Sequence, residues 1–234
     1  MNRFEQTAFD TARALARRRG GRPALHPDGI LLTGRLHVPR HDTPWGVPWL
    51  DTPGAYPVTA RWSRAAGLPG PVPDGLGLAV RVQDAGGPGR PLELLLTSSG
   101  SGKVARHLPL PRRCATTGPY ATLLNYSVGG RHGVVAAFPE RRSDRVPAVP
   151  GAVAAAVARA PMSFHLGFGT AAGWQPLARF ALEGAMTADS RGGVAFDPYR
   201  NCLAGFRPVA SLSALRVAAY AGSRAGRHAR PASP

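Results

Sequence analysis

Near the carboxyl end of the sequence, two arginines, a tyrosine and a serine are spaced so that a helix would place them on one face. Arg216 precedes Tyr220 by one helical turn, and Ser223 and Arg227 follow on nearly the same side. A guanidinium beside a phenol favours the anion, so Arg216 would lower the pKa of Tyr220. The resulting phenolate is a strong oxygen donor for ferric iron. The same spacing also suits a simple cation–π stack of arginine on tyrosine, so this segment alone leaves both interpretations open.

The first half of the chain supplies a second group of candidate residues, on segments typical of strands. His26-Pro-Asp-Gly29 precedes an alternating apolar run through Val38 that predicts a strand with one buried face. A second strand is expected to end in Arg61-Trp62-Ser63. Two further strands are expected at 74–82 and 91–97.

These segments, in this order, resemble the haem-dependent catalase-like superfamily. The shared features are a His-x-x-Gly strand start, an Arg-aromatic-Ser strand, an Asp-x-x-Gly strand, a leucine-rich strand and a final Arg-x3-Tyr-x2-Ser-x3-Arg helix. The resemblance covers about residues 25–97 and 207–227. It implies a mainly β fold of the α+β class: an antiparallel β-barrel with an N-terminal helix and a C-terminal helix on the proximal side of a haem.

The resemblance also implies a site and a cofactor. Haem b would be held by Tyr220 as the axial iron ligand, with Arg216, Ser223 and Arg227 on the same helix. Arg61 would lie near the haem propionates. The catalytic residues would be His26, as the proton-transferring group, and Ser63, whose hydroxyl would orient the histidine ring.

One departure from the family pattern bears on the activity. Catalases carry an asparagine just after the leucine-rich strand, whereas this chain has Thr97-Ser98-Ser99 there. Without that amide, a second hydrogen peroxide would be held less well. We therefore expect a peroxidase that acts on hydrogen peroxide or organic hydroperoxides, with an unidentified electron donor, rather than a dismutating catalase.

The domain organisation is expected to be simple. With 234 residues, the chain has room for little more than the haem-bearing barrel. We expect an N-terminal helical segment at 1–24, the barrel domain at 25–227 and a disordered tail at 228–234. Within the barrel, periodicity predicts further strands at 133–138, 162–169 and 174–184 and a helix at 150–160. The terminal helix is expected to run from near Pro208 or Val209 to about Arg227.

The composition leaves two other functions open. The formal net charge of +16 would ordinarily suggest a nucleic acid or an anionic surface as partner. However, Lys103 is the only lysine in a chain crowded with Arg, Ala, Gly and Pro, which indicates a GC-rich genome. No aromatic platform accompanies the charge, so nucleic acid is not the favoured partner. The alternatives are a degenerate barrel that binds haem or a small molecule without turnover, and a basic protein that interacts with nucleic acid.

The remaining expectations concern compartment, membrane and metals. Cys114 and Cys202 are the only cysteines, which does not favour a disulfide framework. No stretch approaches the roughly 18 apolar residues that span a bilayer, and residues 1–22 do not form a signal peptide. We expect a cytoplasmic protein without a membrane partner; a homo-oligomer is left open. His37 and His41, together with Asp42, could in principle bind a metal ion. The sequence places no further ligand sharply beside them, so solvated histidines are favoured over a metal site.

Overall fold

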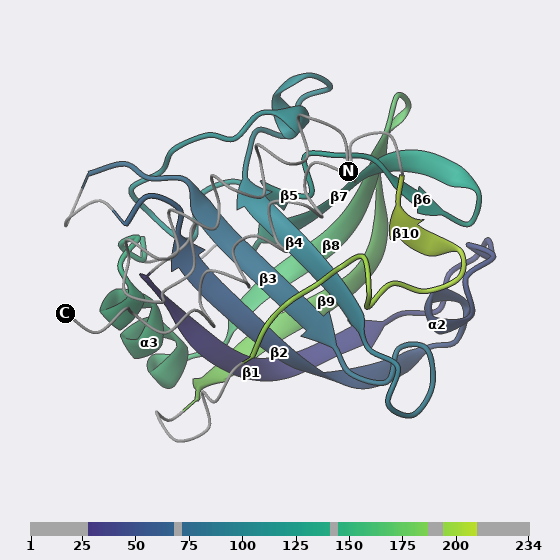
Figure 1. Ribbon diagram of the computed structural model, residues 1–234, viewed down its shortest axis with the longest axis horizontal. Helices are drawn as coiled ribbons and strands as arrows, with labels where there is room; N and C mark the ends of the chain where they lie inside the picture. The colour runs from purple at the N-terminus through teal and green to yellow at the C-terminus, as the bar shows by residue number, and fades with distance from the viewer. Residues whose placement is uncertain (1–27, 68–71, 141–144, 187–193, 210–234) are drawn as a thin grey trace, which may run out of the picture.

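The sequence folds into a barrel of antiparallel strands, as the computed structural model shows (Figure 1). The structure describes residues 28–67, 72–140, 145–186 and 194–209. Within these ranges, eight strands close into a ring in the order β1-β2-β3-β4-β5-β7-β8-β9, and β9 pairs back onto β1. Their bounds are Asp28–Val38 (β1), Gly54–Arg64 (β2), Leu76–Val82 (β3), Leu92–Ser98 (β4), Tyr120–Ala121 (β5), Arg131–Pro139 (β7), Met162–Thr170 (β8) and Gly173–Ala185 (β9).

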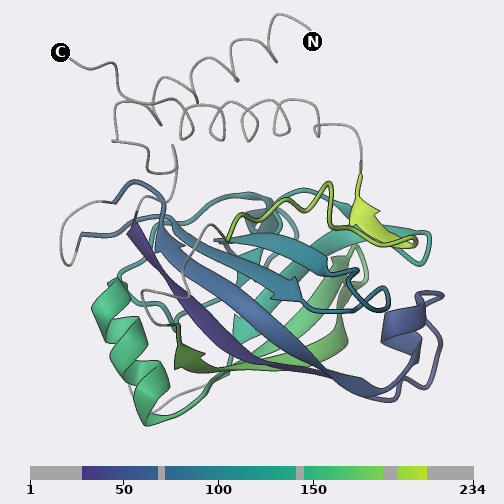
Figure 2. The same ribbon diagram turned by 60° about the horizontal axis from the view of Figure 1, so that its bottom comes forward.

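Two short strands extend the barrel wall at β7. Strand β6 (Tyr126–Val128) pairs with the start of β7, and β10 (Phe206–Pro208) pairs with β6. The short helix α2 (Pro48–Asp51) and the longer α3 (Pro150–Arg159) lie at opposite sides of the barrel (Figure 2). A single 3₁₀ turn, η1 (Ala105–His107), lies in the loop between β4 and β5. None of the described helices is long and apolar enough to cross a membrane.

Alternation along the strands separates an apolar interior from an outer face. On β3 and β4, the buried leucines and valines at every second position point into the barrel, and their neighbours point outward. Aromatic rings fill the centre, where Phe164 stacks on Phe180 with ring centroids 4.8 Å apart. Burial of this interior is the main favourable contribution to folding.

Two local features shape the barrel where β9 pairs with β1. Between Thr33 and Gly34 the pairing of β1 with β9 shifts by one residue, which is a β-bulge. A Cβ at Gly34 would lie 1.9 Å from the Ala181 carbonyl oxygen, so this close approach requires glycine. Helix α3 begins with Pro150 and covers the ring with Val153, Ala156 and Val157, which lie on one helical face against β9 and β1.

The predicted mainly β, antiparallel barrel is confirmed, and each of the seven strands expected from periodicity lies within an observed strand to within two residues. The helix predicted at 150–160 is also confirmed. The sequence did not predict β5, β6, β10 or α2. The terminal helix was expected to start near Pro208 or Val209; it does not begin at Pro208, which lies in β10 and pairs with Tyr126. The rest of that helix, the N-terminal helix and the tail at 228–234 lie outside the described residues.

Candidate functional site

Five small side chains form a continuous row across the outer face of the barrel. Strand register places Gly29 opposite Ser63, Ser63 opposite Gly77, Gly77 opposite Thr97, and Thr97 opposite Ala121. We call this set the outer row. None of its side chains is larger than threonine. Ala121, at the β5 end, is fully buried in an apolar cluster with Leu123, Phe138 and Trp174, so the floor without bulky side chains is confined to β1 to β4. A flat ligand can lie against a floor of this kind.

Arg61 lies on the same outer face, two residues before Ser63 on β2. Its guanidinium lies directly over Gly29: a Cβ at Gly29 would be 2.9 Å from the Arg61 Cζ atom and 2.7 Å from the Trp62 carbonyl oxygen. The glycine therefore makes room for the half-buried arginine at the start of β1. Ser63 is 3% exposed beside it. The fold thus brings together Arg61 and Ser63, two of the residues that the resemblance assigned to the site.

The other predicted site residues are His26, Arg216, Tyr220, Ser223 and Arg227, and they lie outside the described residues. Sequence adjacency still links one of them to the outer row. His26 lies two residues before Asp28, at which β1 begins, and Gly29 is the first member of the row. Its role, and those of the residues near Tyr220, remain predictions.

Thr97 and Ser98, two of the three hydroxyl residues that stand where the family has its asparagine, lie on opposite faces of β4. Thr97 is in the outer row and half-buried. Ser98, the next residue, is fully buried and bonded on both sides: its Oγ accepts from the Leu76 N–H at 2.9 Å and donates to the Leu110 carbonyl at 2.7 Å. The sequence left both Thr97 and Ser98 open as the residue in the asparagine's place. Of these two, Thr97 shares the outer face with Ser63 and Ser98 does not, which favours Thr97.

A segment that the sequence reasoning missed crosses the outer face beside the row. Residues 194–205, which lead into β10, run over β3 and β4, as both ribbon views show (Figures 1 and 2). The segment is fastened to Glu93, whose side chain is fully buried on the outer face of β4. Glu93 accepts hydrogen bonds from the Arg81 side chain and from the Asp197 N–H, and its own N–H donates to the Asn201 carbonyl at 2.8 Å.

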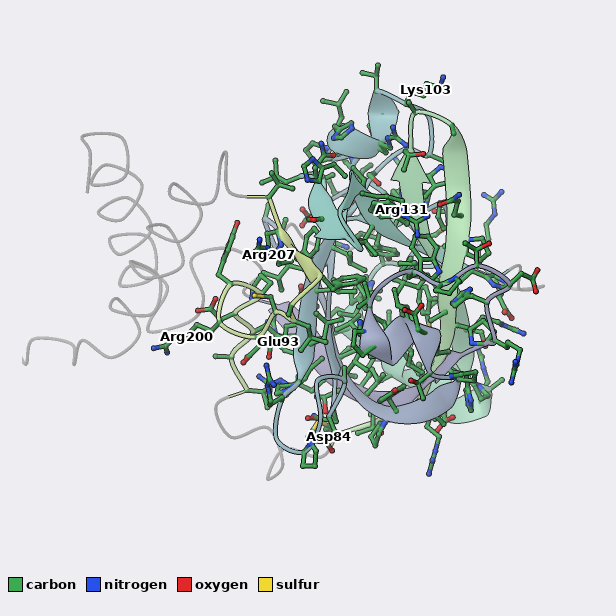
Figure 3. The ribbon with its side chains drawn as sticks, turned by 90° about the vertical axis from the view of Figure 1, so that its right-hand side faces the viewer. Asp84, Glu93, Lys103, Arg131, Arg200 and Arg207 are labelled. Carbon is green, nitrogen blue, oxygen red and sulfur yellow. The ribbon has the colours of Figure 1, made fainter. Side chains whose placement is uncertain are left out.

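Arg81 holds the same segment from β3. Its guanidinium donates to the Ala195 carbonyl at 2.7 Å and lies 5.2 Å from the centre of the Phe196 ring. Figure 3 shows Glu93 next to the segment that carries Arg200 and Arg207. A sequence signal existed: an arginine on one strand and a glutamate on the next fall in register, each within an otherwise apolar strand.

A small hollow lies where this segment meets the barrel. Leu95 forms part of its floor, and Tyr126, Tyr199 and Pro208 are among its walls. The hollow has room for about one water molecule. A porphyrin does not fit into it, so a haem would have to lie elsewhere along the outer face.

Tyr120 is not suited to act as a phenolate ligand. Its ring is fully buried inside the barrel, where the hydroxyl donates to the Ala115 carbonyl at 2.7 Å and accepts from the Trp62 Nε1–H at 3.1 Å. Burial raises the pKa of the Tyr120 phenol far above its usual value, so the group stays protonated. Its hydroxyl links Ala115 and Trp62 inside the barrel, which is a structural role.

The histidines weighed earlier as a metal site do not form one in the described part of the chain. His37 is exposed, and His41 donates from Nε2 to the Leu177 carbonyl at 2.9 Å. Among the residues that the structure describes, no three His, Cys, Asp or Glu side chains gather closely enough to bind a metal ion.

The sequence matches no protein-family model and no curated protein. The fold, however, is similar to that of solved catalases. A bacterial catalase superimposes with a TM-score of 0.64 at 12% identity, over 87% of this chain and 56% of that one. A fungal catalase superimposes with a TM-score of 0.62 at 11% identity, over 87% of this chain and 59% of that one. The chain thus has the catalase-like barrel fold and spans between half and two thirds of the length of these two proteins.

Proposed function

We propose that this protein binds haem b on the outer face of the barrel and reduces peroxides. The observation that carries the proposal is a coincidence of fold and site. The chain shares its fold with two catalases along 87% of its length. On that fold, Ser63 and Arg61 fall side by side on one outer face at the start of β1, the strand that follows His26.

The residues present suit the cofactor. From β1 to β4, the outer row offers a floor without bulky side chains. Arg61 supplies a fixed positive charge at one end of that floor, where a propionate would be neutralised. Tyr220 would hold the iron as a phenolate, with Arg216 favouring its anionic form. A haem held in this way supplies the redox chemistry that breaks the O–O bond of a peroxide.

The other residues move and direct protons. His26 takes the proton from the attacking oxygen of the peroxide and returns it to the oxygen that leaves, acting first as a base and then as an acid. Ser63 orients the imidazole ring for this transfer. In total, an organic hydroperoxide takes up two electrons and two protons and yields an alcohol and one water, and hydrogen peroxide yields two waters. The electrons come from the unidentified donor.

Haemin titration of the full chain tests the proposal. The wild-type protein should develop a haem absorbance band that saturates at one equivalent, and peroxide should then drive oxidation of a dye. Tyr220→Phe should weaken haem affinity by more than the ~10–100-fold that loss of a supporting residue typically costs at a metal site, because the ligand itself is lost. Tyr199→Phe is the matched control and should bind haem normally.

Three results would contradict the proposal. Equal affinity and an unchanged spectrum in Tyr220→Phe would remove the ligand assignment. Haem uptake without dye oxidation would indicate a non-catalytic binder. No uptake at all, with salt-sensitive binding of DNA instead, would favour the nucleic-acid alternative.

A further inference from the structure

Exposed aliphatic side chains are concentrated in the loop between β4 and β5. Large hydrophobic side chains that are exposed in the described part of the chain are Val72, Val104, Leu108 and Leu110. Three of these four lie within seven consecutive residues around η1, and Val104 is 73% exposed. We call residues 101–113 the η1 loop. Isolated exposed apolar residues are common, but a cluster on one loop indicates an interaction surface.

The η1 loop is firmly anchored, so these side chains are not free to fold back onto the barrel. Arg106 is buried beneath it and donates to the Thr170 carbonyl at 3.0 Å, with its guanidinium 5.7 Å from the Trp174 ring centre. Trp174 in turn donates from Nε1 to the Ser101 carbonyl at 2.9 Å. On the other side, His107 donates from Nδ1 to the Leu123 carbonyl at 2.8 Å.

That last contact holds an unusual backbone. Leu123 has a φ of 60°, a left-handed conformation that is unfavourable for a leucine. Its side chain packs with Phe138 and Trp174 onto the outer apolar cluster of β5 and β7. The loop thus stands on a rigid apolar base, and its exposed side chains require no ordering before they bind a partner.

In sequence, the charged residues of the η1 loop and its flanking segments have one sign. Between Glu93 and Glu140 the sequence contains no acidic residue, whereas Lys103, His107 and Arg113 are exposed on the loop itself. Two acidic residues of the described part of the chain that adjoin this stretch, one by strand pairing and one in sequence, are already paired. Asp74, whose backbone pairs with Arg112, is buried with Arg64, and Glu140 pairs with Arg179 and His165. Lys103 points outward at one tip of the molecule, opposite Asp84 (Figure 3).

We propose that the η1 loop binds the surface of an anionic lipid bilayer. Val104, Leu108 and Leu110 insert among the acyl chains just below the headgroups, while Lys103 and Arg113 stay at headgroup level and attract the negative lipids. A nucleic acid would satisfy the charges but would gain little from aliphatic tips, and none of the exposed large hydrophobics of the described residues is aromatic. A second copy of this +16 chain would be repelled.

The binding of the η1 loop to a bilayer surface does not depend on the proposed haem chemistry. No membrane partner was expected because no stretch of the sequence approaches the length of apolar residues that spans a bilayer, and that reasoning does not bear on a short insertion of this kind.

Co-sedimentation of the full chain with vesicles tests the proposal. The wild-type protein should bind vesicles of phosphatidylcholine with 30% phosphatidylserine more tightly than vesicles of phosphatidylcholine alone, and raising the salt concentration should weaken that binding. The double variant Val104→Ser/Leu108→Ser keeps the charge and removes the apolar tips. It should bind the anionic vesicles at least about tenfold more weakly.

Two variants control for charge and for folding. Val104→Asp/Leu108→Asp should abolish binding. Ala155→Asp/Ala158→Asp adds the same two charges at exposed positions of α3 and should lower binding only slightly. Unfolding curves should show all three variants folded. The proposal is overturned if the wild-type protein does not sediment with anionic vesicles or if the serine variant binds as well as the wild type. It is also overturned if the loop variants instead disrupt a dimer or binding to DNA.

Discussion

The two faces of the same strands follow different rules. Inside the barrel, alternate residues of β1 to β4 are large, apolar and almost completely buried, and their identities follow from the need to fill space. Outside, at the same height, the outer row consists of glycine, serine, threonine and alanine, with Arg61 beside it. The inner face therefore accounts for stability, and the outer face carries the chemistry that we propose.

Thr97 and Ser98 show this difference at a single step along one strand. Both are hydroxyls, and successive residues of a strand point to opposite faces. Ser98 faces inward and satisfies two backbone groups. Thr97 faces outward, in register with Gly77 and therefore one strand further from Ser63. A hydroxyl can thus serve packing or the site, depending only on which way its strand position points.

The largest expected effect of breaking the outer face is on turnover. His26→Ala should keep haem bound, because the iron ligand lies elsewhere, and should lower peroxide turnover by about 10²–10⁴-fold, which is the usual contribution of a positioned acid–base group. Dye oxidation at saturating haem is the measurement. The free energy of unfolding should change little. Wild-type turnover in this variant would show that another group transfers the proton or that free haem is responsible.

Removal of a hydroxyl on the inner face should instead lower the stability of the protein and leave turnover unchanged. Ser98→Ala leaves the buried Leu76 N–H without its acceptor and should lower the free energy of unfolding by about 1–3 kcal/mol. Haem affinity and turnover of the folded protein should stay at wild-type values. Denaturant unfolding followed by haem titration measures both.

Ser63→Ala is the control from the outer face. This substitution also deletes a serine hydroxyl, but from the outer face of the barrel wall. Turnover should fall by less than in His26→Ala, because the Ser63 hydroxyl orients the imidazole ring and does not transfer the proton. If Ser98→Ala lost turnover without losing stability, the assignment of functions to the two faces would be wrong.

The sequence predicted the long strands of the barrel and missed the short ones. Strands β1 to β4 were predictable because their inner residues alternate with the period of a strand, and β7 to β9 because apolar runs of strand length stand between turn residues. Strands β5, β6 and β10 have two or three residues each, too few to show any period. Pro208 was read as the start of a helix, since proline is common there, but its missing N–H is equally tolerated at the edge strand β10.

The candidate site was predictable only through the family resemblance, because nothing in an Arg-Trp-Ser triplet by itself indicates which neighbours it meets. Register supplied what the motif could not, by placing Gly29 under Arg61 and Thr97 in the row with Ser63. The fastening of residues 194–205 by Glu93 and Arg81 was missed for the same reason. Each is the one charged residue of its strand, but only the register of β3 and β4 shows that the two face each other.

The smallest expected effect tests which outward hydroxyl replaces the asparagine of catalases. Dismutation requires a second peroxide to be held near the cofactor, and a side-chain amide reaches further than a hydroxyl and offers two N–H donors instead of one. Thr97→Asn should therefore raise the ratio of oxygen release to dye oxidation. One added hydrogen bond corresponds to a rise of roughly two- to tenfold. Oxygen-electrode and dye assays on the same preparation measure the ratio.

Two controls distinguish the position from the residue type. Thr97→Val keeps the shape, removes the donor and should not raise the ratio. Ser98→Asn introduces the same amide one residue later, where it faces the packed interior; it should destabilise the protein and leave the ratio of the folded fraction unchanged. A rise in Ser98→Asn but not in Thr97→Asn would reverse the facing that register assigns. Oxygen release by the wild-type protein at the rates of dedicated catalases would show that the missing amide is not needed, because the threonine hydroxyl or another donor would already hold the second peroxide.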